Sequence, residues 1–329
     1  MAYDGRALAR AGQILHDRAQ AHENELNARA EKLTALCPEL GVIGTQLRRT
    51  VLGVISDALS SGADMKEKLR AAQAENRRLR ERRASLLLSL GYPSDHLDRA
   101  PLCPLCSDSG YTEQGMCPCL QSLYREELAE ALHTACGVPP VTLDAFDLSV
   151  FSDLRVPGER TTVRESMRYN LHICRRFVEN DLSRDSLFFC GQPGTGKTWL
   201  AAAAGYSLCE KGVYVVYICA GQFFACCEDD RFRRTEEARA EIRRWEECDV
   251  LILDDLGTET NSSLNASALY QLLNTRLAAG KATVLCAGFG VEELSRRYGA
   301  QTASRVGGEF KTLYFRGGDL RGRRNANFS

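Results

Sequence analysis

The sequence predicts an α/β fold for its C-terminal part, with a parallel five-stranded sheet. An α-helical region and a small zinc-binding knuckle precede it. Three observations lead to this prediction. Short apolar runs alternate with helical stretches from residue 163 onward, a glycine-rich phosphate-binding motif follows the first of these runs, and two closely spaced cysteine pairs come before them all. Alternation of strand and helix is typical of a parallel sheet covered by helices on both faces.

The strands and helices of this part follow one another in regular order. Strands are expected at 187–190, 213–219, 250–254, 283–287 and 312–315. Helices are expected at 163–179, at 197–211, within 221–247 and at 264–279. Because the strands of such a sheet run parallel, ligands are expected at their carboxyl ends.

The most specific motif fits G-x-x-x-x-G-K-[ST] and will be called the P-loop. Its residues are Gly191, Gln192, Pro193, Gly194, Thr195, Gly196, Lys197 and Thr198. Glycines allow backbone N–H groups to face phosphate oxygens, and the N-terminus of the following helix favours negative charge. Lys197 is expected to reach the β- and γ-phosphates of ATP, and the Thr198 hydroxyl to bind Mg²⁺. The alternative is a chance glycine-rich turn.

A second motif makes a chance glycine-rich turn less favoured than a true phosphate-binding loop. The apolar run 250–253 ends in two acids, Asp254 and Asp255, which is the Walker B pattern. Asp254 is expected to hold Mg²⁺ through water, and Asp255 to orient the water that attacks the γ-phosphate. Both motifs follow predicted strands and serve one reaction. The sequence therefore predicts an ATPase in which Lys197, Asp254 and Asp255 are catalytic.

Composition excludes few classes of protein. The chain has 329 residues, enough for two or three units, and its 42 Lys and Arg nearly balance 43 Asp and Glu. Nucleic-acid binding would therefore need a local basic patch. The first residues lack the apolar segment of a secretory signal, and no run has the length of a membrane span, so we expect a cytoplasmic protein without a membrane partner. The 14 cysteines are expected to be thiols and metal ligands.

The chain divides into three predicted regions. Residues 1–100 are expected to form a helical, partner-binding region that breaks at Gly41 and near 60–62. Its last helix, with an imperfect heptad seam over 69–90, favours a helical hairpin or a partner-binding helix over a long coiled coil. Residues 101–136 form a zinc-binding segment and a helix, and residues 137–329 form the ATPase domain.

Four cysteines in the second region have the spacing C-x2-C-x10-C-x-C. They are Cys103, Cys106, Cys117 and Cys119, and the segment 103–119 will be called the cysteine knuckle. Four thiolates can complete a tetrahedral Zn²⁺ site, which leaves no open position and makes the metal structural. The alternative is a set of buried or free thiols.

With these residues in view, the chain resembles bacterial replicative helicase loaders of the DnaC and DnaI type, AAA+ ATPases related to the transposition helper IstB. Motifs carry the resemblance at 90–93, 103–119, 253–259 and 298–321. It implies an AAA+ P-loop NTPase that uses ATP to load a DnaB-type replicative DNA helicase onto single-stranded DNA. It also implies that the N-terminal and zinc regions bind the helicase and that the ATPase domains assemble with one another.

The resemblance also implies roles for several arginines. Arg305 matches the arginine finger, which reaches the γ-phosphate bound by a neighbouring subunit, and Arg321 matches the sensor 2 arginine, which acts within its own subunit. Region 222–247 matches helices that contact single-stranded DNA in relatives. Its arginines are Arg231, Arg233, Arg234, Arg239, Arg243 and Arg244.

One position departs from the family pattern. Relatives carry a polar sensor 1 residue, commonly Asn, at the tip of the fourth strand, where this chain has Gly288. A glycine has no side chain to contact the γ-phosphate, so we expect ATP to bind and hydrolysis to be slow. Two alternatives stay open at this stage. One is an ATP-binding scaffold with weak hydrolysis, and the other is an IstB-like transposition helper.

Overall fold

The computed structural model describes residues 3–59, 65–155, 158, 160–179, 185–260 and 262–321. The chain packs as two compact units, one of residues 12–120 and one that joins residues 1–11 to residues 121–329. We call them the helical unit and the ATPase unit. They are defined by packing, whereas the predicted division at residues 100 and 136 concerns function and stays a prediction.

The ATPase unit is built on one sheet of five strands. They are β3 (Ser186–Gly191), β4 (Val215–Cys219), β5 (Val250–Leu256), β6 (Ala282–Ala287) and β7 (Phe310–Phe315). All neighbouring strands pair parallel, in the order β4-β5-β6-β3-β7. The predicted α/β fold with a five-stranded parallel sheet is therefore confirmed. β6 lies between β3 and β5, and the carboxyl ends of all five strands share one edge.

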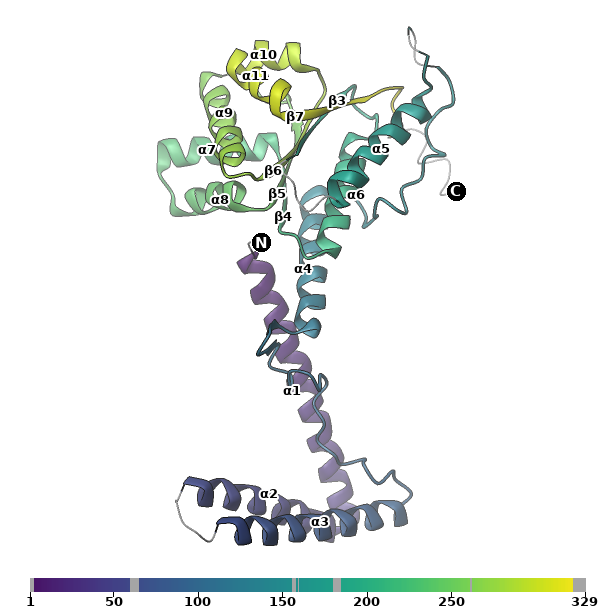
Figure 1. The fold of residues 1–329 in the computed structure, drawn as a ribbon, viewed down its shortest axis with the longest axis vertical. Helices are drawn as coiled ribbons and strands as arrows, with labels where there is room; N and C mark the ends of the chain where they lie inside the picture. Colours follow the sequence, from purple (N-terminus) through teal and green to yellow (C-terminus); the bar gives the residue numbers. More distant parts are fainter. Residues whose placement is uncertain are drawn as a thin grey trace. The chain divides into compact units, whose positions relative to one another are not determined.

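Helices cover both faces of this sheet. They are α4 (Pro118–Cys136), α5 (Val163–Glu179), α6 (Lys197–Glu210), α7 (Ala220–Arg233), α8 (Glu236–Glu247), α9 (Ser263–Ala278), α10 (Val291–Tyr298) and α11 (Ala300–Glu309). α5 and α6 lie on one side of the sheet, and α7, α8 and α9 lie on the other (Figure 1). The central strands are buried on both sides, which explains why their sequences are apolar without alternation.

A buried arginine joins three elements of this unit. Arg276 on α9 has no exposed surface. Its guanidinium donates to the carbonyl oxygen of Cys248 at 3.0 Å, just beyond the end of α8, and to the hydroxyl of Thr283 on β6 at 3.0 Å. It also donates to the carbonyl oxygen of Trp245 near the end of α8. The last carbonyls of a helix have no partner within the helix, so Arg276 satisfies groups that burial would otherwise leave unpaired.

The helical unit contains three long helices and a two-stranded sheet. α1 (Gly5–Leu36) begins in the ATPase unit and continues here, followed by α2 (Pro38–Leu59) and α3 (Met65–Ser89). β1 (Tyr111–Thr112) and β2 (Gly115–Met116) pair antiparallel inside the cysteine knuckle. No described helix has the length and apolar character to cross a membrane.

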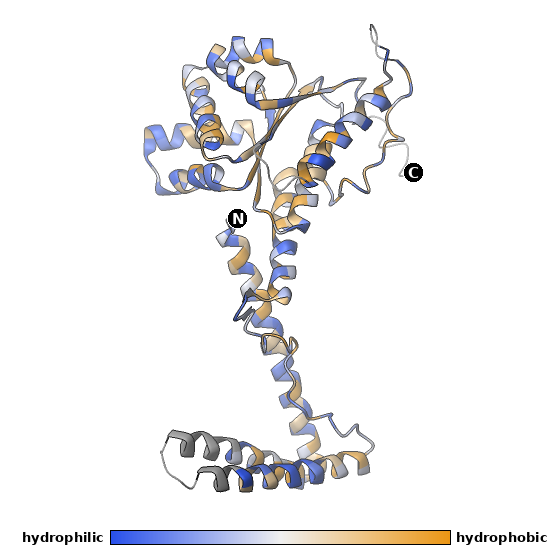
Figure 2. Ribbon diagram, viewed as in Figure 1, coloured by the Kyte–Doolittle hydropathy of each residue, from blue (hydrophilic) through white to orange (hydrophobic). Residues whose placement is uncertain are grey.

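The predicted helix break at Gly41 is wrong. α1 ends at Leu36, α2 begins at Pro38, and Gly41 lies inside α2. Proline suits the first position of a helix because its missing N–H group needs no partner there. The other predicted break, near 60–62, lies outside the described residues. α3 is hydrophilic in its middle and apolar towards its C-terminus (Figure 2), where Leu87 packs in a core with Leu33 and Leu40.

Candidate functional site

The P-loop joins the end of β3 to the start of α6, and its glycines are required by close contacts. A Cβ atom on Gly191 would lie 2.1 Å from the carbonyl oxygen of Phe315, and one on Gly194 would lie 2.1 Å from Oδ1 of Asp319. Gly196 is the N-cap of α6, with φ of 97°, and no side chain caps the helix. The first N–H groups of α6 are thus left for an anionic ligand, which fits a phosphate group.

Lys197 lies against the loop that it ends. Its Nζ donates to the carbonyl oxygens of Gly191 at 2.8 Å and Gln192 at 2.9 Å, and the residue is only 8% exposed. Burial lowers the pKa of Lys197, while Cys286 and Asp254 oppose this change. Neutral carbonyl oxygens are weaker acceptors for an ammonium group than charged phosphate oxygens. A bound phosphate would therefore give Lys197 stronger hydrogen bonds than its present partners do.

Asp254 and Asp255 lie at the end of β5. Asp254 is fully buried, and its two carboxylate oxygens accept different donors. Oδ1 accepts the N–H of Asp255 at 2.8 Å, and Oδ2 accepts the hydroxyl of Tyr217 at 2.6 Å. Mg²⁺ prefers oxygen ligands, so the carboxylate of Asp254 and the hydroxyl of Thr198 would suit this ion. Sequence reasoning missed Tyr217, because an apolar strand pattern does not show which side chains meet across strands.

Asp255 has a strained backbone and a shifted acidity. Its φ of 55° is left-handed, which is unfavourable for a residue other than glycine, and such strain gathers at functional sites. Burial and then the charge of Asp254 raise the pKa of Asp255, while Lys197 and Arg321 oppose the rise. Asp255 as a whole residue is exposed, so its partly desolvated carboxylate can still meet water.

The segment that follows β6 packs against the turn after Asp255. A Cβ atom on Gly257 would lie 2.2 Å from Phe289. Arg297 on α10 donates to the carbonyl oxygen of Gly257 at 2.9 Å and lies 5.1 Å from the centre of the Phe289 ring. Gly288, at the predicted sensor 1 position, is exposed, and a Cβ there would meet nothing within 4 Å. Phe289 and Arg297 are further contacts that the sequence did not suggest.

The C-terminal segment of the described chain returns to the P-loop. The N–H of Leu320 donates to the carbonyl oxygen of Gly194 at 2.9 Å, and Oδ1 of Asp319 accepts the N–H of Arg321 at 2.8 Å. The positive charge of Arg321 opposes the rise in the pKa of Asp255. Its predicted role as the sensor 2 arginine stays a prediction.

Arg305 is placed differently. It is exposed on α11, and within the part of the chain that the structure describes it has no hydrogen bond or ion pair. The structure therefore leaves Arg305 available at the surface and does not bring it together with the P-loop. Its predicted role as an arginine finger stays a prediction.

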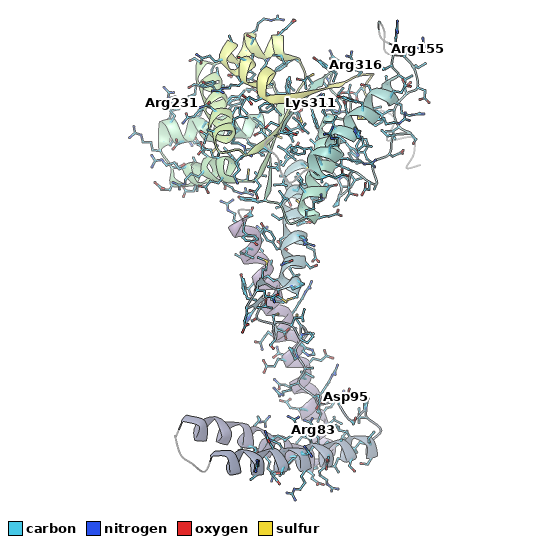
Figure 3. The ribbon with its side chains drawn as sticks, viewed as in Figure 1. Arg83, Asp95, Arg155, Arg231, Lys311 and Arg316 are labelled. Carbon is cyan, nitrogen blue, oxygen red and sulfur yellow. The ribbon has the colours of Figure 1, made fainter. Side chains whose placement is uncertain are left out.

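The arginines of α7 and α8 fall into two groups. Three have acidic partners: Arg233 pairs with Asp229, Arg239 with Asp230 and Glu236, and Arg244 with Asp4 and Glu241. The others, Arg231, Arg234 and Arg243, are exposed. Arg231 lies on the side of the unit away from α5 and α6 (Figure 3). Next to it, Phe232 is 76% exposed, so this end of α7 offers an aromatic ring among cations.

The four cysteines of the knuckle come together. Their Sγ atoms all lie within 4.8 Å of one another, with 3.7 Å between Cys103 and Cys117 and 3.5 Å between Cys106 and Cys119. A tetrahedral site with Zn–S bonds of about 2.3 Å needs S–S distances of about 3.8 Å. The sulfur positions therefore fit zinc, which when bound would hold this segment folded.

The backbone of the knuckle also suits a metal, and the pKa values of its thiols are shifted in both directions. The carboxylate of Asp108 accepts the N–H groups of Cys103 at 2.7 Å and Leu102 at 3.0 Å, which shapes the first turn. Burial disfavours the thiolate of Cys106, yet the Gly110 backbone and the neighbouring thiols lower its pKa to about 7. Burial raises the pKa of Cys119. Four thiolates this close repel one another unless a cation joins them.

Comparisons with known proteins cover the part of the chain that contains the P-loop and the Walker B acids. Residues 171–304 match the family model described as IstB-like ATP binding protein. This range contains the P-loop, Asp254 and Asp255, whereas the cysteine knuckle, Arg305 and Arg321 lie outside it.

The proteins to which this chain is similar include helicase loaders and insertion-sequence proteins. The replicative helicase loader DnaC of Escherichia coli strain K12 is 27% identical over 134 residues, 40% of this chain and 54% of that protein. A putative insertion sequence ATP-binding protein of Sinorhizobium fredii is 34% identical over 95 residues, 28% of this chain and 35% of that protein. The crystal structure of DnaI matches with 20% identity and a TM-score of 0.46, over 60% of this chain and 99% of that chain.

The chain spans about half the length of the DnaC protein that it matches. The predicted resemblance to loaders of the DnaC and DnaI type is confirmed, and the matched range 171–304 is similar to IstB-like ATP-binding proteins. The individual site residues stay predictions, because these comparisons test none of them.

Proposed function

We propose that this protein is an ATPase that loads a DnaB-type replicative helicase onto single-stranded DNA. The observation that carries the proposal is the meeting of three parts of the chain at one sheet edge. Lys197 lies on the P-loop, Asp254 and Asp255 lie at the end of β5, and Arg321 comes from the C-terminal segment. Phosphoryl transfer needs this combination of cation, metal ligand and water-orienting carboxylate.

The residues have the following roles in the proposal. The P-loop and the α6 N-terminus bind the phosphates, and Lys197 exchanges its carbonyl partners for the β- and γ-phosphate oxygens. Bound Mg²⁺ would neutralise phosphate charge, held by Thr198 and, through water, by Asp254. Asp255 orients the attacking water. Arg321 stabilises the transition state within the subunit, and Arg305, exposed on α11, does so from a neighbouring subunit.

ATP then acts as a switch on assembly. Because Arg305 reaches the site of the next subunit, ATP-bound subunits associate head to tail, and hydrolysis releases them. The helical region and the zinc-bound knuckle hold the helicase, while Arg231, Arg234, Arg243 and Phe232 contact single-stranded DNA through phosphate pairing and base stacking. We propose a cytoplasmic location for this work.

A second candidate function is that of a transposition helper. The 34% identity to an insertion-sequence protein of Sinorhizobium fredii favours it. A third is an ATP-binding scaffold with weak hydrolysis, which Gly288 favours because it removes the sensor 1 side chain.

A loading assay separates these functions. Purified helicase, ATP and a closed single-stranded DNA circle are mixed with wild type, with Lys197→Ala, or with Lys311→Ala, which changes an exposed lysine on β7. We expect wild type and Lys311→Ala to transfer helicase to the circle and Lys197→Ala to fail. If wild type transfers none but stimulates strand transfer by a transposase, the transposition function replaces the loader. If wild type binds ATP but neither transfers helicase nor stimulates strand transfer, the scaffold function replaces the loader.

A further inference from the structure

Tyr217 makes a buried contact with the Walker B motif that the proposed mechanism does not use. It lies on β4 and is 8% exposed. β4 pairs with β5 so that Tyr217 is opposite Ile252 and Cys219 is opposite Asp254. The Tyr217 side chain reaches along the sheet to Asp254, where its hydroxyl donates to Oδ2 at 2.6 Å.

Asp254 depends on this contact. The carboxylate is fully buried, and a buried carboxylate needs donors to replace its lost hydration. Among the described residues no Lys or Arg forms an ion pair with it. The hydroxyl of Tyr217 donates a hydrogen bond to Oδ2, and the N–H of Asp255 donates one to Oδ1. Two donors on different oxygens fix the rotation of the carboxylate group.

The hydroxyl of Tyr217 is not needed for packing. β4 is otherwise apolar in Val215, Val216 and Ile218, and a phenyl ring would fill the same space. A buried hydroxyl without an acceptor is unfavourable, and the acceptor here is Asp254. The polar atom of Tyr217 therefore serves the carboxylate.

We propose that Tyr217 is a positioning residue for Mg²⁺, because it holds the carboxylate of Asp254 in the orientation that binds the metal with ATP. Tyr217 thus sets how much more tightly ATP binds with Mg²⁺ than without it. The inference rests on the proposed function, since it concerns the same nucleotide site.

The test is the change Tyr217→Phe, which removes only the hydroxyl. Tyr214→Phe is the matched control, because its hydroxyl lies next to the same strand and accepts from Arg244 at 3.2 Å. The affinity for a fluorescent ATP analogue is measured with Mg²⁺ and with EDTA. A hydrogen bond to a charged group suggests that Tyr217→Phe binds roughly tenfold more weakly with Mg²⁺ and within about twofold of wild type in EDTA. Tyr214→Phe should match wild type in both.

A double-mutant cycle makes the result specific. In an Asp254→Asn background, adding Tyr217→Phe should change the Mg²⁺ dependence no further, since the contact is already altered. If Tyr217→Phe keeps the wild-type Mg²⁺ dependence, or weakens binding equally in EDTA, the inference is wrong while the proposed function stands. If wild type binds no nucleotide in either condition, the proposed function itself fails.

Discussion

The nucleotide site and the cysteine knuckle are built in opposite ways. The nucleotide site joins residues from Gly191 to Arg321, and the buried strands of one sheet hold them in place. The knuckle takes its four proposed zinc ligands from the short segment 103–119, whose two strands have two residues each. The first site is supported by a hydrophobic core, whereas the second has little core, so we expect a bound metal to support it. Changes to each should therefore have separable effects.

Loss of zinc should have the largest effect and should stay local. In Cys117→Ser, a fully buried ligand is lost. Structural zinc contributes on the order of 10 kcal/mol to small sites, so segment 103–119 should unfold while ATP binding persists. Zinc content and limited proteolysis measure this, with Cys37→Ser, outside the cluster, as the control. A Cys117→Ser protein that keeps a full equivalent of zinc would show that these thiols are not the ligands.

Arg276→Met should have the converse effect. It leaves the buried carbonyl group of Cys248 without the Arg276 donor and that of Trp245 with only the Cys248 thiol, so the ATPase unit should lose about 3 kcal/mol of unfolding free energy. Zinc content should not change. Denaturant unfolding measures the loss, and the exposed Arg231→Met, at the end of α7, should change it by less than about 0.5 kcal/mol. Equal stability of the two variants would contradict the role given to Arg276.

Arg321→Ala should shift the pH dependence of hydrolysis. Asp255 must be ionised to orient water, so the rate falls as pH drops through the pKa of Asp255. Burial and Asp254 raise this pKa, and Arg321 opposes the rise. Removing Arg321 should raise the pKa further and move the acid limb of the rate profile to higher pH. The exposed Arg176→Ala, on α5, is the control. An unshifted acid limb in Arg321→Ala would place Arg321 outside the site.

Gly288→Asn should have the smallest effect, and it should be a gain. A Cβ atom at Gly288 meets nothing within 4 Å, so an Asn side chain fits at the sensor 1 position. We expect hydrolysis to rise about threefold to tenfold, because an added polar group can contact the γ-phosphate or the attacking water. Gly290→Asn, two residues on and equally open, is the matched control. No gain in steady-state hydrolysis would show that Gly288 does not limit the rate.

The difference between the two sites also explains what the sequence could predict. All five strands lie where apolar runs predicted them, and α5 has the predicted bounds, because buried strands and amphipathic helices leave periodic patterns. Local spacing likewise predicted that the four cysteines would meet. The contacts of Tyr217 with Asp254, of Asp319 with Gly194 and of Phe289 with Gly257 were not predictable, since each joins residues that are distant in sequence. The predicted break at Gly41 was wrong because Pro38, and not the glycine, marks the start of the second helix.

Capture of the helicase tests the proposed function most directly. It asks whether the nucleotide site controls helicase binding and whether the cysteine knuckle is needed for that binding. Wild type, Lys197→Ala and Cys103→Ser are each used to pull down the host's replicative helicase with ATP present. We predict that wild type captures the helicase, that Cys103→Ser does not although it still binds ATP, and that Lys197→Ala loses any capture that depends on ATP. If wild type binds ATP and captures no helicase, the loader function is wrong.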